Sequence, residues 1–391
     1  MPHYNHLIIG GGMTAAAAMK SIREVDANAT IGLIGAEPHK PYNRPPLSKG
    51  LWKGEPIESI WRDVPQTGVT LHLGRRAVRL EPASKRVTDD LGAIYTFDKL
   101  LLATGGTPRR LSFGFEDVIY FRGYDDYRRL RALADERRRF AVIGGGFIGS
   151  EIAAALRMLE RDVVMLMPEQ GLGARVFPSD LSHALVEFFR GKGIEMRTGD
   201  GLTSLTATGS SVAVETTQSG TFETDAVVAG LGIELNVDLA RQAGLAIDNG
   251  IVVDEFLRTA HHDIFAAGDV ANFFSPALGS RMRAEHEDNA NTMGAHAGRN
   301  MAGALTAYEH LPLFYSDLFE LGYEAVGDVD SRLETVSDWK VPFREGVVYY
   351  LRDGRVRGVL LWNVWGKVDV ARQLIAEPGP FTAQSLVGWI S

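Results

Sequence analysis

Residues 140–151 read Phe-Ala-Val-Ile-Gly-Gly-Gly-Phe-Ile-Gly-Ser-Glu, and the fold can be inferred outward from this stretch. Its apolar first half predicts a buried strand, and Ile148–Leu159 is compatible with a helix. Gly144, Gly146 and Gly149 have the spacing with which a strand turns into a helix around a bound pyrophosphate. Glycines let backbone N–H groups approach the phosphates, and the helix N-terminus favours their charge. The stretch therefore predicts a dinucleotide-binding site.

A second glycine loop of the same kind lies near the N-terminus. Gly10-Gly11-Gly12-Met13-Thr14-Ala15 follows the apolar run His6–Gly10 and opens the alanine-rich segment Met13–Val25, which can form a helix. The strand–helix–strand pattern thus occurs twice, which indicates an internal duplication of nucleotide-binding units. Further apolar runs that predict buried parallel strands are Thr30–Gly35, Lys99–Ala103 and Val163–Met167. Two such loops are most simply explained by a flavin in one site and a nicotinamide in the other.

Each unit offers an acid where the second strand ends, the usual position for binding a ribose hydroxyl. In the first unit this acid is Glu37, and the alternative interpretation is a solvated turn residue. In the second unit Glu169 favours NADH, because a carboxylate there repels the 2′-phosphate of NADPH. Arg175 is close enough in sequence to leave NADPH open.

The composition is that of a globular protein and excludes several chemistries. Of 391 residues, 45% are hydrophobic and 23% charged, and the formal net charge of −8 argues against wholesale nucleic-acid binding. The absence of cysteine excludes disulfides, thiolate nucleophiles and Cys-ligated zinc or iron–sulfur clusters. No apolar run approaches the roughly 18 residues of a membrane span. Met1–His6 leaves no room for a targeting peptide, so we expect a cytoplasmic protein, and we expect no metal site.

Two further segments matter for function. Arg128–Arg139 contains six arginines against two acids and is best interpreted as a solvated helix. A nucleic-acid surface and a docking face for an acidic ferredoxin are the alternatives. Near the C-terminus, Val347–Arg352 and Arg355–Trp362 flank the turn pair Asp353-Gly354 and predict a hairpin, followed by a helix over Val368–Ile375. We expect a small α+β domain there.

The quoted loops belong to a longer series of motifs that resembles a known family. Four blocks resemble the FAD-dependent pyridine nucleotide oxidoreductases: Pro41–Lys49, Ala103-Thr104-Gly105, Gly144–Glu151 and Ala266-Ala267-Gly268-Asp269. Three C-terminal blocks are similar to the apoptosis-inducing factors and their bacterial relatives, beside the ferredoxin reductases of oxygenase systems: Phe314–Leu318, Gly322–Gly327 and Leu361-Trp362-Asn363.

The resemblance implies an α/β protein with two Rossmann-like dinucleotide-binding domains and a small C-terminal α+β domain. FAD would be bound by residues 1–110 and 240–310, NADH by residues 111–239, and residues 311–391 would form the interface domain. The implied activity is hydride transfer from NADH to FAD, followed by electron transfer to an external acceptor such as a ferredoxin. The alternative is an NADH-responsive redox sensor with slow turnover and NADH-linked dimerisation, so a homodimer is a second possible assembly.

The resemblance also assigns site residues. Lys49 and Glu151 resemble a buried pair at the reactive edge of the flavin, and His286 is a third catalytic candidate, with a structural histidine as the alternative. The expected FAD contacts are Gly10, Gly12, Ala15, Glu37, Arg44, Lys49, Val78, Thr104, Arg109 and Asp269. The expected NAD contacts are Gly144, Gly146, Gly149, Glu169, Gly232 and Glu324. The family's ribose acid aligns with Ala36, so Glu37 must act from one residue later or the register shifts.

His286 also begins a predicted helix. Ala290, Met293, Ala297 and Met301 follow it at helical spacing and predict one buried face. Small residues on this helix, among them Ala295 and Gly298, predict close packing against the sheet or the cofactor.

Overall fold

The computed structural model describes residues 1–113 and 115–390. The chain forms two compact units, and each is described by itself. Unit 1 consists of Met1–Arg44, Pro56–Thr107 and Glu234–Phe314. Unit 2 consists of Pro45–Glu55, Pro108–Ile233 and the described residues from Tyr315 onward. Residues 45–55, which the sequence places in the first domain, therefore pack within unit 2, and the predicted three-domain boundaries stay a prediction.

Unit 1 is built on a sheet in the order β3-β2-β1-β6-β5-β4, with β18 pairing β6. Its strands are β1 (His3–Ile9), β2 (Ile31–Gly35), β3 (Val69–Leu73), β4 (Ala77–Glu81), β5 (Arg86–Asp89), β6 (Ile94–Leu102) and β18 (Ile264–Ala266). β1 pairs in parallel with β2 and β6, and β18 is parallel to β6. The apolar runs predicted as strands in this part of the chain are confirmed, and their residues are buried in one hydrophobic core.

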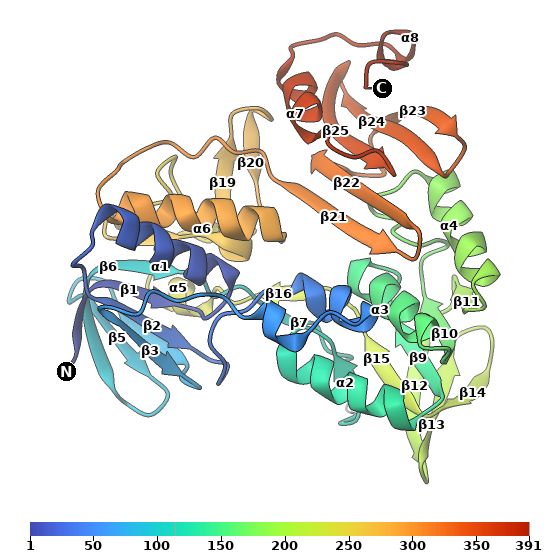
Figure 1. Cartoon of the computed structure of the whole chain (residues 1–391), viewed down its shortest axis with the longest axis horizontal. Coiled ribbons are helices and arrows are strands. Elements are labelled where there is room, and N and C mark those ends of the chain that lie inside the picture. Colours follow the sequence, from blue (N-terminus) through green and yellow to red (C-terminus); the bar gives the residue numbers. More distant parts are fainter. Residues whose placement is uncertain (114, 391) are drawn as a thin grey trace. The chain divides into compact units, whose positions relative to one another are not determined.

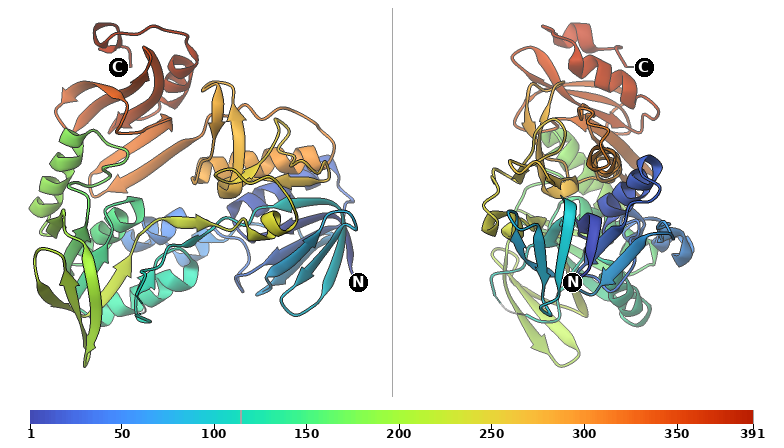
Figure 2. Two further views of the ribbon diagram at one scale, coloured as in Figure 1. Left: turned by 180° about the vertical axis from the view of Figure 1, so that it is seen from behind. Right: turned by 90° about the vertical axis from the view of Figure 1, so that its left-hand side faces the viewer.

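Two helices of unit 1 pack closely beside each other, α1 (Met13–Val25) and α6 (Glu287–Met301) (Figures 1 and 2). A Cβ built on Gly294 would lie 2.4 Å from the carbonyl oxygen of Thr14, and one on Gly298 would lie 2.5 Å from that of Ala18. The close approach therefore requires glycine at these positions. Four residues of the predicted apolar face, Ala290, Met293, Ala297 and Met301, are buried, and of the two small residues named in the prediction Gly298 meets α1. The remaining elements of the unit are α5 (Asp238–Gln242), β17 (Ile251–Val252), β19 (Ala271–Ser275) and β20 (Ser280–Met282).

Unit 2 contains the second nucleotide-binding sheet, in the order β11-β10-β9-β15-β8, with all pairs parallel. Its strands are β8 (Ile119–Tyr120), β9 (Arg139–Ile143), β10 (Asp162–Met167), β11 (Glu195–Thr198) and β15 (Ala226–Ala229). The helices are α2 (Tyr124–Glu136), α3 (Phe147–Met158) and α4 (Ser179–Gly191), and β12 (Leu202–Thr208), β13 (Ser211–Thr216) and β14 (Thr221–Thr224) form an antiparallel sheet. The second predicted strand–helix–strand unit is thus confirmed.

The C-terminal part of unit 2 is an antiparallel sheet in the order β21-β22-β25-β24-β23, with α7 (Val368–Ala376) packed on β22 and β25. Its strands are β21 (Leu313–Leu318), β22 (Leu321–Gly327), β23 (Glu334–Val341), β24 (Glu345–Arg352) and β25 (Arg355–Trp362), and α8 (Ala383–Leu386) follows α7. Asp353 and Gly354 both have positive φ, 53° and 70°, as a tight two-residue hairpin turn requires. The predicted hairpin, helix and α+β character are confirmed.

Short strands β7 (Gly106–Pro108) and β16 (Ile233–Leu235) carry the chain from one unit to the other. Among the residues described, no helix combines the length and the apolar character needed to cross a membrane.

Candidate functional site

The first glycine loop, in unit 1, has the geometry of a phosphate cradle. Gly10 adopts φ +115°, and a Cβ there would lie 2.0 Å from the carbonyl oxygen of Ala103. Gly12 caps α1 without a side-chain hydrogen bond, and a Cβ on it would meet nothing within 4 Å. Ala15 is fully buried against the core. Open space before an uncapped helix N-terminus fits a dinucleotide pyrophosphate.

The second loop, in unit 2, repeats this arrangement. Gly144 adopts φ +106°, and a Cβ on Gly149 would lie 2.0 Å from the carbonyl oxygen of Gly144. Gly146 caps α3 and, like Gly12, has open space where a Cβ would stand. The three glycines thus have the geometry of a tight turn, an open approach for phosphate and close packing of helix on strand, and their contacts with NAD stay a prediction.

Glu37 is bound to its own neighbours in unit 1. The Tyr42 hydroxyl donates to Glu37 Oε2 at 2.5 Å, Arg44 forms an ion pair with Oε1, and Arg44 also donates to the Tyr42 oxygen at 3.0 Å. Burial raises the pKa of Glu37, but Arg44 and Tyr42 outweigh it and hold the pKa below its usual value of 4.5. Glu37 is therefore a charged member of a small network, and its role at a ribose stays a prediction.

Three other expected FAD residues in unit 1, Thr104, Asp269 and Val78, differ in how firmly their surroundings hold them. The Thr104 hydroxyl donates to the carbonyl oxygen of Asn236 at 2.7 Å, and the Asn236 amide returns a hydrogen bond to Thr104 at 2.9 Å. Asp269 directly follows Gly268, whose φ of +76° sets a turn packed on Thr14 of α1. Val78 is 44% exposed on β4. Their contacts with FAD stay predictions.

Arg109 belongs to unit 2, although the sequence groups it with the FAD residues. Its backbone N–H donates to the carbonyl oxygen of Gly232 at 2.9 Å, and its Nε donates to that of Ile233 at 3.2 Å. Gly232 adopts φ +83°, and a Cβ on it would meet nothing within 4 Å. The structure therefore brings together Arg109 and Gly232, predicted to contact different cofactors.

Lys49 and Glu151 form the buried ion pair that the resemblance predicts. Lys49 Nζ lies 2.8 Å from Glu151 Oε1, and the two side chains are 14% and 4% exposed. Glu151 lies in α3, one turn after the second glycine loop, and Lys49 lies between η1 (Pro45–Leu47) and η2 (Gly50–Lys53). Trp52 holds this segment within unit 2, because its Nε1 donates to Leu47 and its ring packs edge-on against Tyr127 of α2.

Two serines that sequence reasoning missed complete the surroundings of Glu151. Ser48 Oγ donates to Glu151 Oε2, and Ser316 Oγ donates to Oε1, each at 2.5 Å. Both serines are buried. Each stands in a motif block that carries the family resemblance, but the carboxylate that they share becomes evident only from the fold.

Glu169 and Arg175 lie in the loop that follows β10 in unit 2. Arg175 is 3.6 Å from Glu169 Oε1, and its side chain is 90% exposed, against 33% for Glu169. A contact this long and exposed is weak. Arg175 therefore engages the carboxylate only weakly, and the role of Glu169 at a ribose stays a prediction.

Glu324 on β22 has a buried carboxylate oxygen, Oε2, with no hydrogen-bond partner among the residues described. Burial raises the pKa of Glu324 above 4.5, and the backbone N–H of Gly366 offsets this only partly. Buried polar atoms are normally paired. An unpaired acceptor here fits a ligand that donates a hydrogen bond, such as the carboxamide of a nicotinamide.

His286 stands at the N-terminus of α6 in unit 1. Its ring is stacked on Phe314, with 4.5 Å between centroids and 18° between planes. The stacking fixes the imidazole, and its catalytic role stays a prediction.

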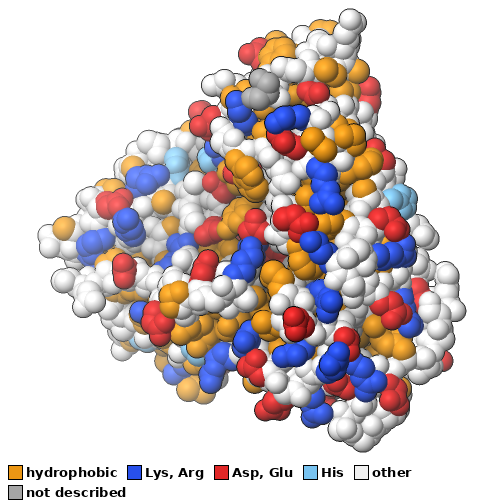
Figure 3. Space-filling view, turned by 45° about the vertical axis from the view of Figure 1, so that its right-hand side comes forward, with side chains coloured by type: hydrophobic (Ala, Val, Ile, Leu, Met, Phe, Trp, Pro, Cys, Tyr) orange, Lys and Arg blue, Asp and Glu red, His pale blue; other side chains and the backbone are white. Residues whose placement is uncertain are grey.

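The arginine-rich segment runs from α2 into β9. Four of its six arginines form ion pairs with acids: Arg129 with Asp117, Arg131 with Asp135, Arg138 with Asp162 and Arg139 with Asp225. Figure 3 shows basic and acidic side chains interspersed over the visible face. Charge compensated in this way favours the solvated-helix interpretation over a nucleic-acid surface.

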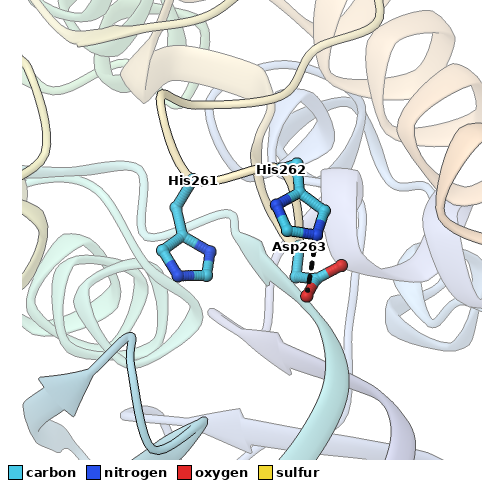
Figure 4. Close-up of side chains that lie close together, drawn as sticks. All are labelled: His261, His262 and Asp263. Carbon is cyan, nitrogen blue, oxygen red and sulfur yellow. Dashed lines mark ion pairs between the residues drawn. The ribbon is translucent and has the colours of Figure 1, made fainter.

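One group of potential metal ligands, His261, His262 and Asp263, comes together in unit 1 (Figure 4). The carboxylate of Asp263 already binds two ammonium groups, those of Lys85 at 2.6 Å and of Lys99. The two positive charges repel a further cation, so we assign no metal to this group.

The sequence pattern of the pyridine nucleotide-disulphide oxidoreductases matches residues 4–296. The chain belongs to the pyridine nucleotide-disulphide oxidoreductase family. The C-terminal pattern of mitochondrion-associated apoptosis-inducing factor matches residues 297–342 and 337–377. Because this oxidoreductase has no cysteine, the disulphide of the family name has no counterpart in it.

Known relatives support the same assignment. The chain is 36% identical to the ferredoxin–NAD(+) reductase component of the anthranilate 1,2-dioxygenase system of Burkholderia cepacia, covering 95% of this chain and 93% of the relative. It is 34% identical to mitochondrial apoptosis-inducing factor 1 of Dictyostelium discoideum, covering 96% and 78%. The putidaredoxin reductase in its covalent complex with putidaredoxin superimposes with a TM-score of 0.90 at 28% identity, covering 97% of this chain and 94% of that one. The protein is thus an oxidoreductase that uses FAD and NAD(H), as predicted.

Proposed function

We propose that this oxidoreductase takes hydride from NADH onto FAD and passes the electrons to a small iron–sulfur protein of the ferredoxin class. The observation that carries the proposal is the pairing of two dinucleotide cradles with a chain free of cysteine. With no disulfide or thiol to receive electrons inside the protein, they leave the flavin for an external acceptor. The similarity to a ferredoxin–NAD(+) reductase and to putidaredoxin reductase supports an acceptor of this class.

The bound FAD supplies the redox chemistry, since it accepts a hydride and can release electrons singly. The glycine loops orient the two nucleotides by their pyrophosphates. Lys49, held by Glu151, supplies a positive charge where negative charge develops on reduction. Glu324 offers an acceptor that holds the nicotinamide amide in one orientation. The protein's share of catalysis is therefore positioning and electrostatics.

Anaerobic titration with NADH, followed by addition of acceptors, tests the proposal. We expect one NADH to bleach one flavin, and a reduced flavin that ferredoxin reoxidises far faster than oxygen does. Failure of every ferredoxin tested to reoxidise it, together with a persistent long-wavelength charge-transfer band, would refute the proposal.

That second outcome would favour the redox-sensor alternative, which the apoptosis-inducing factor similarity of residues 297–377 supports. In that case NADH should also convert monomer to dimer, which sedimentation or scattering would detect. The two functions therefore separate in one experiment.

We further propose NADH as the preferred donor, because Glu169 presents a carboxylate where NADPH would carry its 2′-phosphate. Comparing reduction rates with the two nucleotides measures this preference. The cytoplasmic location and the homodimer stay predictions.

A further inference from the structure

The carboxylate of Glu151 is bound by side chains from two other segments of unit 2. Ser48 and Lys49 come from the loop between η1 and η2, and Ser316 comes from β21 in the C-terminal sheet. Lys49 and Ser316 share Oε1, while Ser48 binds Oε2. Ser48, Glu151 and Ser316 are 5%, 4% and 1% exposed. The carboxylate and its two hydroxyl donors are therefore largely shielded from bulk solvent.

We propose that Ser316 is a positioning residue for hydride transfer: it fixes the Glu151 carboxylate, and through it holds the Lys49 ammonium in a single orientation. The inference rests on the proposed role of Lys49 in the reaction. It adds that a residue of the C-terminal sheet, Ser316, is needed to keep Lys49 in place.

The direction of the hydrogen bonds supports this assignment. Ser316 has a single hydroxyl proton and gives it to Glu151 Oε1. Tyr323 of β22 lines the same small cavity as Ser316. Burial and the nearby Glu151 charge raise the pKa of Tyr323 well above 10, which keeps its proton in place. Ser316 is therefore a donor to a charged carboxylate, and such a hydrogen bond is stronger than one between neutral groups.

The neighbouring residue in β21 contacts the other partner of the pair. Lys49 Nζ lies 5.1 Å from the centre of the Tyr315 ring, a cation–π distance. Two successive residues of one strand therefore contact the ammonium and the carboxylate. Without Ser316, Oε1 would keep only Lys49, and the carboxylate could rotate about its remaining bond to Ser48.

The test compares Ser316→Ala with Ser182→Ala, a matched control in unit 2. Ser182 is 2% exposed and donates to the Leu172 carbonyl oxygen at 2.7 Å, and among the interactions described it bonds to neither Lys49 nor Glu151. Anaerobic stopped-flow at increasing NADH gives both the limiting rate of flavin reduction and the dissociation constant. We expect S316A to slow the limiting rate about tenfold, or about 1.4 kcal/mol, with NADH affinity within about twofold of wild type. S182A should leave the rate unchanged.

Conservative replacement separates positioning from packing. Ser316→Thr keeps the hydroxyl, and Ser316 borders a small cavity together with Leu318 and Tyr323. We expect S316T to restore most of the rate. If S316A fails to retain FAD, Ser316→Cys, with a weak donor of similar size, takes its place and should show the same slowing. Equal rates in the Ser316 and Ser182 variants would overturn the proposal.

A second comparison tests whether Ser316 acts through Lys49. In a Lys49→Ala background, S316A should cause no further slowing, whereas multiplied effects would show an independent role and overturn the proposal. The proposed role of Lys49 and the positioning role of Ser316 are refuted by different results. A normal rate in K49A would refute the role of Lys49 itself, while a slow K49A with a normal S316A would refute only the positioning by Ser316.

Discussion

Replacing Lys49 with alanine removes the one cation that contacts the buried Glu151 carboxylate, among the interactions described. At 2.8 Å and an effective dielectric constant near 20, the gross attraction of the pair is about 6 kcal/mol. Removing one partner of a buried pair typically costs about 3–5 kcal/mol of stability. Because Ser48 and Ser316 continue to bind the carboxylate, we expect the lower end of that range.

The effect on the reaction is smaller than the gross attraction, since only the part that differs between oxidised and reduced flavin matters. One charged hydrogen bond is worth about 1.5–3 kcal/mol, which corresponds to a reduction rate about ten to one hundred times slower. We expect FAD to remain bound, because Lys49 is one of ten expected FAD contacts and the glycine loop that would hold the pyrophosphate is unchanged.

Anaerobic stopped-flow at saturating NADH measures this rate, and flavin absorbance per mole of protein measures FAD content. Lys192→Ala is the matched control, since Lys192 pairs with Glu320 at 2.7 Å in unit 2 but is 33% exposed. A K49A protein that retains FAD and is reduced as fast as K192A would refute the reasoning.

Three further predictions concern other parts of the molecule. Burial raises the pKa of Asp263, but two lysines outweigh it and lower the pKa from 3.8 to about 2, so the stability that Asp263→Asn removes is present above about pH 3.8. That contribution is lost as the pH falls through 2, where the melting temperatures of wild type and D263N should converge; parallel curves would contradict the assignment. Gly298→Ala places a Cβ 2.5 Å from the Ala18 carbonyl oxygen and should cost about 1–3 kcal/mol in chemical unfolding, whereas Gly191→Ala in α4 meets open space and should be neutral. Glu324→Gln should raise the NADH dissociation constant about fivefold. Because burial raises the pKa of Glu324, wild type should bind NADH less tightly as the pH falls, and the variant should not show this loss. Identical NADH titrations of wild type and E324Q would exclude Glu324 from the site.

The two nucleotide-binding units could be predicted from sequence because their signal is local. Glycine spacing, a preceding apolar strand and a following helix lie within about 20 residues, and each feature has a steric cause. The Asp353-Gly354 hairpin was predictable for the same reason, since two adjacent residues with positive φ define the turn.

The surroundings of Glu151 were not predictable from local pattern. Ser316 lies 165 residues from Glu151, and no periodicity connects them. The placement of residues 45–55 in unit 2 depends on Trp52 meeting Tyr127, a contact between a loop and a helix. Glu37 occupies the predicted place after β2, but its pairing with Arg44 depends on how the following loop folds back.

The five passages of the chain between the units have a consequence for biosynthesis. β18 pairs with residues 100–102 of β6, and α6 packs on α1, yet both are translated only after residue 263. By then every strand of the second nucleotide-binding sheet, which lies within residues 119–229, has been translated. The nascent N-terminal sheet therefore keeps an open strand edge while a later sheet closes, and such edges attract chaperones and aggregation partners. The sheet that begins first is therefore completed only after the second nucleotide-binding sheet.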